Sequence, residues 1–226
     1  MAIQATLIGD VVASRAAADR ADLHRVLSAA LDEVNTTFRP TIPLRITLGD
    51  EYQGAFADLG SAARAALALT VRIADVYDVR HGLGWGEVTE LQQEPRVEDG
   101  PGWWAARAAI ETVHDLQQRP ATGWVRTRLK VASQSPLPPG MAGAFGAALS
   151  LRDQAIARLS PRAVSVLRGL LDGETQREIA ERLQISPSAV SQRIRTDGLG
   201  ALVVADQVWA SDGEASPATT HSKEER

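Results

Sequence analysis

Carboxylates stand at the ends of two β-like segments, where they could hold a divalent cation. The β-like run 3–8 leads to Asp10, and residues 44–56 contain two short β-like runs joined by a tight turn at Asp50. If these strands are neighbours in one sheet, Asp10 and Asp50 lie at the same end of it. Such oxygen ligands suit Mg²⁺, which is usually held by one or two carboxylates plus phosphate oxygens. The alternative is that both aspartates only cap turns and helices.

A second polar group lies towards the C-terminus, within a pattern typical of a helix-turn-helix. Ser160, Thr175 and Ser186 are predicted N-caps, and Pro161 and Pro187 follow the first and the last of them at the first helical position. The predicted helices are 159–171, 176–183 and 188–195, and a four-residue turn separates the last two. Apolar residues recur at helical spacing on the inward side: Ile179, Ala180, Leu183, Val190 and Ile194.

The outward residues of the last of these helices have the chemistry of DNA recognition. Gln and Arg read base edges in the major groove, whereas hydroxyl groups and helix N-termini hold phosphates. There is no acidic residue from Gln184 to Thr196. A helical hairpin used for protein contacts is the alternative. The predicted contacts to double-stranded DNA are Thr175, Gln176, Ser186, Ser188, Ser191, Gln192, Arg193 and Arg195.

The composition is that of an ordinary globular protein. Of the 226 residues, 44% are hydrophobic and 23% are charged, and no run approaches the roughly 18 apolar residues of a membrane span. The N-terminal residues lack a basic region before an apolar stretch, so no signal peptide is expected. The absence of Cys excludes disulfides and thiolate chemistry. We therefore expect a cytoplasmic protein, whose net charge of −4 argues against indiscriminate nucleic-acid binding by the whole molecule.

The elements that must position these side chains follow the order β-α-β-β-α-β, which predicts an α+β, ferredoxin-like domain. Gly82, Gly84 and Gly86 lie inside the last of these strands, where glycine usually marks the close approach of a backbone or a ligand. The segments are 3–8, 19–38, 44–48, 52–56, 59–76 and 79–88.

The remaining segments complete the expected domain organisation. A further strand is predicted at 122–130, a linker at 133–146 and a helix at 147–159; residues 199–209 could form a β-like wing or a dimer strand. Polar residues dominate the C-terminal end, so a disordered tail is expected. The predicted parts are 1–132 (α+β domain), 133–158 (linker and connecting helix), 159–210 (small all-α helix-turn-helix domain) and 211–226 (tail).

The first half resembles the catalytic domain of class III nucleotide cyclases. The shared features are Asp10, the hairpin with Asp50, and the glycine-rich strand 81–88, followed by Gly-Pro and a helix that opens with Ala-Ala-Arg107. The resemblance implies that Asp10 and Asp50 bind metal and that Arg107 stabilises phosphate charge. Trp103 stands where those cyclases have a catalytic Asn, and their base-selecting Lys is not matched, so an intact cyclase is not expected.

Two longer motifs are Ile-Gly-Asp-Val-Val-Ala-Ser-Arg at 8–15 and Thr-Leu-Gly-Asp-Glu-Tyr-Gln-Gly at 47–54. Through them the chain resembles the SatD family, which implies a cytoplasmic protein of unsettled activity. Arg15 could clamp a phosphate near Asp10, or be a solvated residue at a helix entry; Glu51 lies in the second motif. Trp103 and Trp104 could stack on a base or form lids over the core. The helix-turn-helix resembles those of LuxR-type response regulators and of sigma-70 region 4.

Together these features predict a DNA-binding transcriptional regulator, as a homodimer, whose front domain senses a nucleotide or other phosphorylated ligand. The predicted ligand residues are Asp10, Arg15, Asp50, Glu51, Trp103 and Arg107, with Mg²⁺ on Asp10 and Asp50. The alternative is a metal-dependent nucleotide-processing enzyme that carries a DNA-binding module. A third possibility is a ligand-free domain that serves only as a dimerisation platform.

Overall fold

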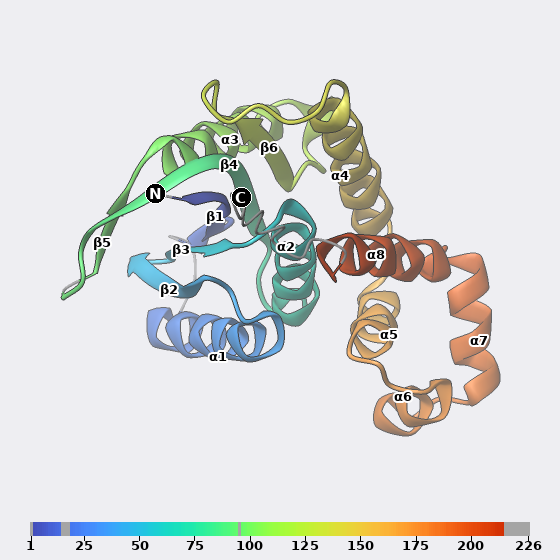
Figure 1. Cartoon of the computed structure of the whole chain (residues 1–226). Coiled ribbons are helices and arrows are strands. Elements are labelled where there is room, and N and C mark those ends of the chain that lie inside the picture. Colours follow the sequence, from blue (N-terminus) through green and yellow to red (C-terminus); the bar gives the residue numbers. More distant parts are fainter. Residues whose placement is uncertain (1, 15–18, 95, 215–226) are drawn as a thin grey trace, which may run out of the picture.

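The computed structural model describes residues 2–14, 19–94 and 96–214. The front domain has the expected β-α-β-β-α-β order and then continues with two short strands and a third helix (Figure 1). Its elements are β1 (Ala2–Val11), α1 (Arg20–Phe38), β2 (Ile42–Leu48), β3 (Glu51–Phe56), α2 (Leu59–Ile73), β4 (Val79–Gln92), β5 (Val97–Asp99), α3 (Pro101–Gln117), the 3₁₀ turn η2 (Pro120–Thr122) and β6 (Thr127–Val131).

Strand β1 lies at the centre of the sheet, between β3 and β4. The strand order is β2-β3-β1-β4-β5, and β6 pairs with β4. All pairs are antiparallel except β4–β6, which is parallel. In this register Gly9 lies opposite Tyr52 of β3, and Asp10 lies opposite Arg80 of β4. The α+β class predicted from the sequence is confirmed.

Helices lie on both faces of the sheet, α3 on one and α1 and α2 on the other (Figure 1), and alternate residues of β1 pack against these two layers. Ala5 and Leu7 are fully buried in the core cluster that includes α1 and α2. Ile8 belongs to a second cluster, with residues of α3. On that face the hydroxyl of Thr6 donates to the carbonyl oxygen of Gly102 at 2.7 Å, which ties the start of α3 to the centre of the sheet. The sheet is therefore covered on both faces.

The glycines of β4 allow the backbone of α3 to approach the sheet. A Cβ atom on Gly82 would lie 2.2 Å from the carbonyl oxygen of Ala106, and one on Gly84 would lie 2.2 Å from that of Gly102. Such separations are far inside van der Waals contact, so a side chain at either position would push the helix away. The glycine-rich strand thus serves close helix packing.

Helices α4 (Met141–Ala157) and α8 (Leu199–Glu214) pack against the front domain. The wing or dimer strand expected at 199–209 is wrong, because this segment is helical and follows a helical burial pattern: Leu199, Leu202 and Asp206 are buried. Trp209 of α8 stacks on Phe145 of α4, with ring centroids 5.1 Å apart. Residues 211–214, expected to be part of a tail, belong to α8, and the rest of that segment lies outside the described residues.

The helix-turn-helix consists of α5 (Pro161–Leu171), α6 (Gln176–Leu183) and α7 (Pro187–Thr196). The predicted caps are present: the side-chain oxygens of Ser160, Thr175 and Ser186 each accept a hydrogen bond from a backbone N–H in the first turn. Its core, which contains Ile179 and Val190, also includes Leu67 and Val71 of α2. The two modules therefore share a hydrophobic core. No described helix meets the length and hydropathy needed to cross a membrane.

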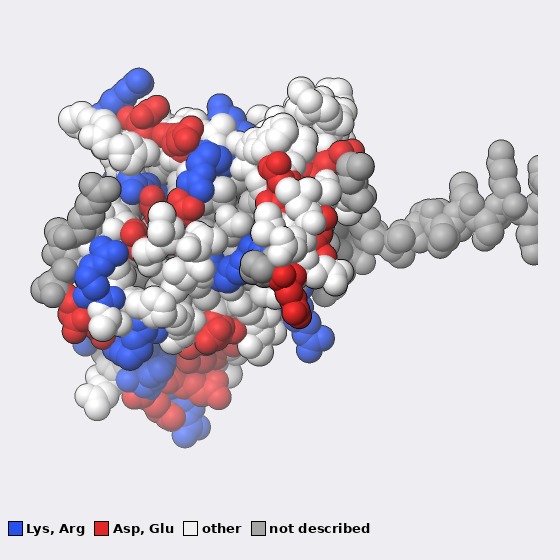
Figure 2. All heavy atoms as spheres, turned by 90° about the vertical axis from the view of Figure 1, so that its left-hand side faces the viewer, with Lys and Arg blue, Asp and Glu red and all other residues white. Residues whose placement is uncertain are grey.

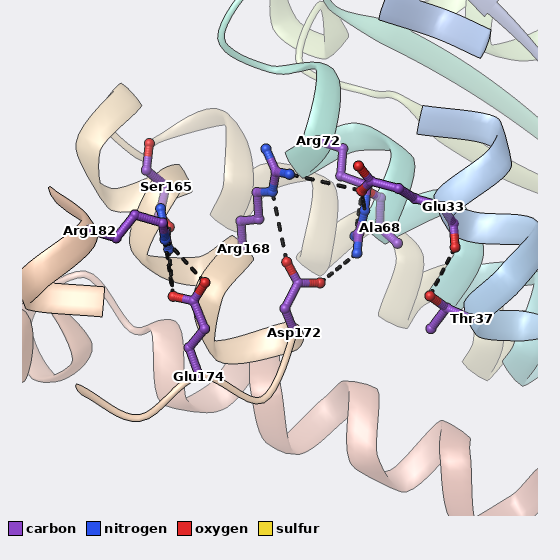
Figure 3. Close-up of polar contacts among 9 residues, drawn as sticks. All are labelled: Glu33, Thr37, Ala68, Arg72, Ser165, Arg168, Asp172, Glu174 and Arg182. Atoms are coloured by element: carbon purple, nitrogen blue, oxygen red, sulfur yellow. Dashed lines mark hydrogen bonds and ion pairs between the residues drawn. The ribbon is translucent and has the colours of Figure 1, made fainter. Parts of the chain in front are cut away.

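Ion pairs add to this shared core (Figure 3). The Arg72 guanidinium of α2 donates to Glu33 of α1 at 2.8 Å and to Asp172, at the end of α5, at 2.5 Å. Arg168 of α5 lies 3.7 Å from Asp172 and 3.9 Å from Glu33. One turn or more closer to the start of α2, Arg64 pairs with Asp206 of α8 at 3.0 Å. Helix α2 is thus the element that joins the front domain to the helix-turn-helix.

Candidate functional site

The structure brings Asp10 and Asp50 to the same end of the sheet. Asp50 lies in the turn between β2 and β3, and its Oδ2 accepts a hydrogen bond from the backbone N–H of Val11 at 3.3 Å. Both oxygens of Asp10 are taken by the guanidinium of Arg80, at 2.6 and 3.0 Å. Arg80 also donates to Gln117 of α3 at 3.2 Å. Asp10 is therefore one half of a bidentate ion pair across two strands.

Arg107 and Glu51 form a second pair of the same kind. The two guanidinium nitrogens of Arg107 donate to the two oxygens of Glu51, each at 2.6 Å, and this contact raises the pKa of Arg107. The face drawn in Figure 2 also shows acidic and basic side chains interspersed. The guanidinium groups of Arg80 and Arg107 are thus already neutralised by carboxylates.

These contacts bear on the predicted metal site. Among the described residues, no three His, Asp or Glu side chains form a group that could hold a metal ion. A cation held between Asp10 and Asp50 would have to displace the Arg80 guanidinium, which carries a positive charge of its own. The side chains therefore do not fit an Mg²⁺ ion in this arrangement, and the Mg²⁺ and nucleotide predictions gain no support from it.

One residue further into the sheet, Tyr52 of β3 and His81 of β4 form a buried pair on either side of Gly9. The hydroxyl of Tyr52 lies 2.7 Å from Nε2 of His81, and both side chains are fully buried. Burial, with the nearby positive charge of Arg152, lowers the pKa of His81 to about 3, so the imidazole is neutral. Burial, with the charge of Asp10, raises the pKa of Tyr52. The motif glycine Gly9 makes room for this pair, since a Cβ there would lie 2.3 Å from the Tyr52 ring.

The other predicted ligand residues of the front domain are placed differently. Trp103 is only 7% exposed and packs with Ile8 and Ile110, so it is a core residue with no open face for stacking. The exposed ring is that of Trp104, whose Nε1 donates to Asp99 at 2.8 Å. Arg15 lies outside the described residues.

Helix α7 lies at the outer edge of the molecule (Figure 1), and it carries a stripe of polar side chains. Ser188, Gln192 and Arg195 are exposed and follow the spacing of one helix face, with Ser191 half-buried beside them. Among the described residues, no side-chain hydrogen bond or ion pair engages Gln192 or Arg195. These two side chains are thus available to a partner.

The remaining predicted DNA contacts have structural partners of their own. Thr175 and Glu178 form a capping box at the start of α6, next to the exposed Gln176. The Ser186 hydroxyl caps α7 and lies 2.8 Å from that of Ser188. Arg193 lies 3.4 Å from Asp197, so it is held at the end of α7. Thr175 and Ser186 would therefore contact a partner only together with the helix starts that they cap. Gln192 and Arg195 can each do so as a single side chain.

The sequence analysis missed the residues that complete these sites. Arg80 and His81 are neighbours on β4, yet they pair with β1 and β3 residues that are 70 and 29 positions away. Arg152 and Asp153 of α4 are buried, and they bind Thr127 of β6 and the carbonyl of Ala63 of α2. An adjacent charged pair inside an otherwise apolar helical segment was the only signal for the second case.

Comparison with protein families gives two matches. The sequence model of the SatD family matches residues 4–136, and that of the LuxR family of bacterial regulatory proteins matches residues 157–195. Both agree with the motifs identified above. A search of curated proteins found no match.

Solved structures similar to this chain include nucleotide cyclases. A bacterial light-regulated adenylyl cyclase is 13% identical with a TM-score of 0.42, covering 50% of this chain and 41% of its own. The adenylyl cyclase CyaB from P. aeruginosa is 13% identical with a TM-score of 0.39, over 49% of this chain and 71% of its own. A regulator of polyketide synthase expression from Bifidobacterium adolescentis is 13% identical, with a TM-score of 0.28, over 95% and 87%. The chain thus spans less than half the length of the light-regulated cyclase.

Proposed function

Since the chain belongs to the SatD family and carries a LuxR-type helix-turn-helix, we propose that it is a transcriptional regulator that binds DNA through α7. The observation that carries the proposal is the stripe of Ser188, Gln192 and Arg195 on α7. These side chains are exposed, and they lie on a helix that carries no acidic residue.

The geometry of the stripe suits the major groove. Gln can pair with adenine and Arg with guanine, each through two hydrogen bonds, and the start of α7 offers backbone N–H groups to a phosphate. Helix-turn-helix proteins usually bind two half-sites as dimers, so we expect a homodimer on DNA. The SatD domain contacts α5 through α2, and through this contact it would act on α7.

The enzyme alternative has less support. A nucleotide with Mg²⁺ at Asp10, Asp50 and Arg107 would have to break two bidentate ion pairs, those of Asp10 with Arg80 and of Arg107 with Glu51. Turnover of ATP or GTP with Mg²⁺ or Mn²⁺ that Asp50→Asn abolishes would favour the enzyme.

The test is DNA binding by the purified chain to the region upstream of its own gene, measured by fluorescence anisotropy at several salt concentrations. Gln192→Ala and Arg195→Ala should each weaken specific binding by about 1–3 kcal/mol, which is roughly 5- to 150-fold. Arg25→Ala is the matched control, because Arg25 is an exposed arginine on α1, far from α7 in the sequence, that pairs with Asp22. Binding that is weakened equally by all three variants, or is no tighter than to unrelated DNA, would contradict the proposal.

A further inference from the structure

A cleft opens where the SatD domain meets the first helix of the DNA-binding module. It has a volume of about 430 Å³, which lies in the range of small-molecule sites. One wall is formed by the end of α2 and the segment 74–78 that follows it; the others come from Trp124, from the last turns of α4, and from Val164 of α5. Both modules therefore contribute to it.

We propose that this cleft binds an organic ammonium ion, a protonated amine with an apolar body, and that the bound amine changes the affinity of the chain for DNA. The second part rests on the function proposed above, whereas the first does not. The cleft is distinct from the Asp10 and Asp50 end of the sheet and shares no residue with it.

The ionisable side chains that line the cleft favour a cation. They are three carboxylates, of Asp75, Asp78 and Asp153, and one guanidinium, of Arg126. Arg126 is already paired with Asp78, at 2.6 Å. Asp153 is buried and is also paired: its Oδ2 accepts hydrogen bonds from the backbone N–H groups of Arg126 and Thr127, and its Oδ1 lies 3.6 Å from the guanidinium of Arg152. Asp75 is exposed and has no ion-pair partner among the described residues, so its carboxylate is available to an incoming ammonium group.

Two helix ends act in the same direction. The C-terminal turn of α2 lines the cleft at Thr70 and Ala74, and that of α4 lines it at Ile156 and Ala157. The last turns of a helix carry partial negative charge from carbonyl groups without intrahelical partners, which stabilises cations and disfavours anions. Arg72 in the last turn of α2 is paired with Glu33 and Asp172, and the last turn of α4 contains no basic side chain before its C-cap residue Arg158.

The uncharged part of the lining suits an apolar body. Trp124 and Tyr77 are half-buried and supply aromatic rings, which attract a cation through their π-faces. Ile156, Ala157 and Val164 supply aliphatic surface. A molecule with a ring or short alkyl chain next to its ammonium group would contact both kinds of surface. A phosphate or carboxylate ligand would meet carboxylates and helix C-termini, while the lining guanidinium of Arg126 is already paired with Asp78, so an anion is disfavoured by charge.

A ligand bound in the cleft would also affect the DNA-binding module. Val164 lies on α5, and its side chain belongs to the core cluster that holds Ile179 of α6 and Val190 of α7. A ligand that prefers one spacing of α5 from the end of α2 changes the population of that spacing, and the coupling is reciprocal between amine and DNA.

The binding test uses isothermal titration calorimetry with three probes of one shape. These are 2-phenylethylamine, the neutral 2-phenylethanol and the anionic phenylacetate. We expect the amine to bind most tightly, and Asp75→Asn to weaken it about fivefold, as the loss of a partly exposed ion pair would. Asp32→Asn, which removes an exposed carboxylate from α1, is the matched control and should have no effect.

A second variant tests the cavity itself. Ala157→Phe places a ring in the cleft from its exposed rim, and we expect it to abolish amine binding without lowering the melting temperature. Amine binding no tighter than phenylacetate binding, no detectable heat with the amine, or amine binding unchanged in both Asp75→Asn and Ala157→Phe would overturn the site.

The coupling is tested by repeating the DNA titration with saturating 2-phenylethylamine. A change of DNA affinity in the wild-type chain that is absent in Ala157→Phe supports it, and an unchanged affinity overturns it. Calorimetry needs no DNA, so a chain that binds amine but no DNA would contradict the proposed function while supporting the cleft as a ligand site.

Discussion

The Asp10 end of the sheet and the outer face of α7 carry similar polar side chains, but in opposite states of pairing. At the sheet, Arg80 and Arg107 are each bound by both oxygens of a carboxylate. On α7, Gln192 and Arg195 extend to solvent, and no acidic residue lies on that helix. The type of residue therefore does not mark a binding surface by itself. A binding surface is marked instead by a hydrogen-bond donor that has no partner among the described residues of the protein.

This comparison predicts that substitutions in the front domain change stability, whereas substitutions on α7 change DNA affinity. The largest stability effect is expected for Arg152→Met. Arg152 is buried and donates to Ala63 and Thr127, and its loss would leave Asp153 buried without its cation. Removing one partner of a buried pair typically costs about 3–5 kcal/mol.

Chemical denaturation of Arg152→Met should show this loss in the free energy of unfolding. Arg158→Met, at an exposed site just after α4, is the control and should change stability by less than about 0.5 kcal/mol. DNA affinity measured well below the unfolding temperature should be unchanged in both variants. If Arg152→Met were as stable as the wild type, the buried pair would not have the role that its contacts indicate.

An intermediate effect on the free energy of unfolding is expected when the pH is lowered, because of His81. Its imidazole faces Tyr52 and Arg152, and its pKa is lowered to about 3 in the fold. Between pH 6.5 and 3 the unfolded chain binds a proton at this residue and the folded chain does not. The free energy of unfolding therefore falls as the pH drops through this window, by up to about 1.4 kcal/mol per pH unit.

The His81 prediction is checked by denaturation of the wild type and His81→Gln at several pH values. The variant should have a shallower slope between pH 6 and 4, because glutamine does not titrate while other groups contribute equally to both chains. His24→Gln removes an exposed histidine and should retain the wild-type slope. Equal slopes for all three chains would show that His81 is not held neutral.

The smallest effect is expected at the junction of the modules, for Arg72→Met (Figure 3). Arg72 pairs with Glu33 and Asp172, and these partners are partly exposed, so solvent screens the interaction. We expect a loss of about 1 kcal/mol in thermal unfolding. Arg25→Met, which breaks an exposed pair within α1, should cost less. If the Arg72 variant unfolded at the same temperature as the Arg25 variant, the hydrophobic core alone would stabilise the contact between the two modules.

Much of the fold was predicted from local signals. The hairpin around Asp50, the helix caps at Ser160, Thr175 and Ser186, and the turn of the helix-turn-helix depend on residues within a few positions of one another. Short sequence motifs are therefore sufficient to predict these features. The segment 199–209 was misassigned because its β-branched residues favour a strand, whereas packing on α2 makes it a helix. Gly60 admits that packing, since a Cβ there would lie 2.6 Å from the carbonyl oxygen of Trp209.

By itself, the sequence determined the main elements of the front domain and of the helix-turn-helix, their order and the polar stripe of α7, because periodicity and capping act over one or two turns. Only the tertiary structure decided the pairing of the charges. Asp10 meets Arg80, and Glu51 meets Arg107, because the register of the sheet and the seating of α3 bring together residues 70 and 56 positions apart. No local pattern encodes such distances, so whether a carboxylate is free to bind a cation is a property of the folded chain.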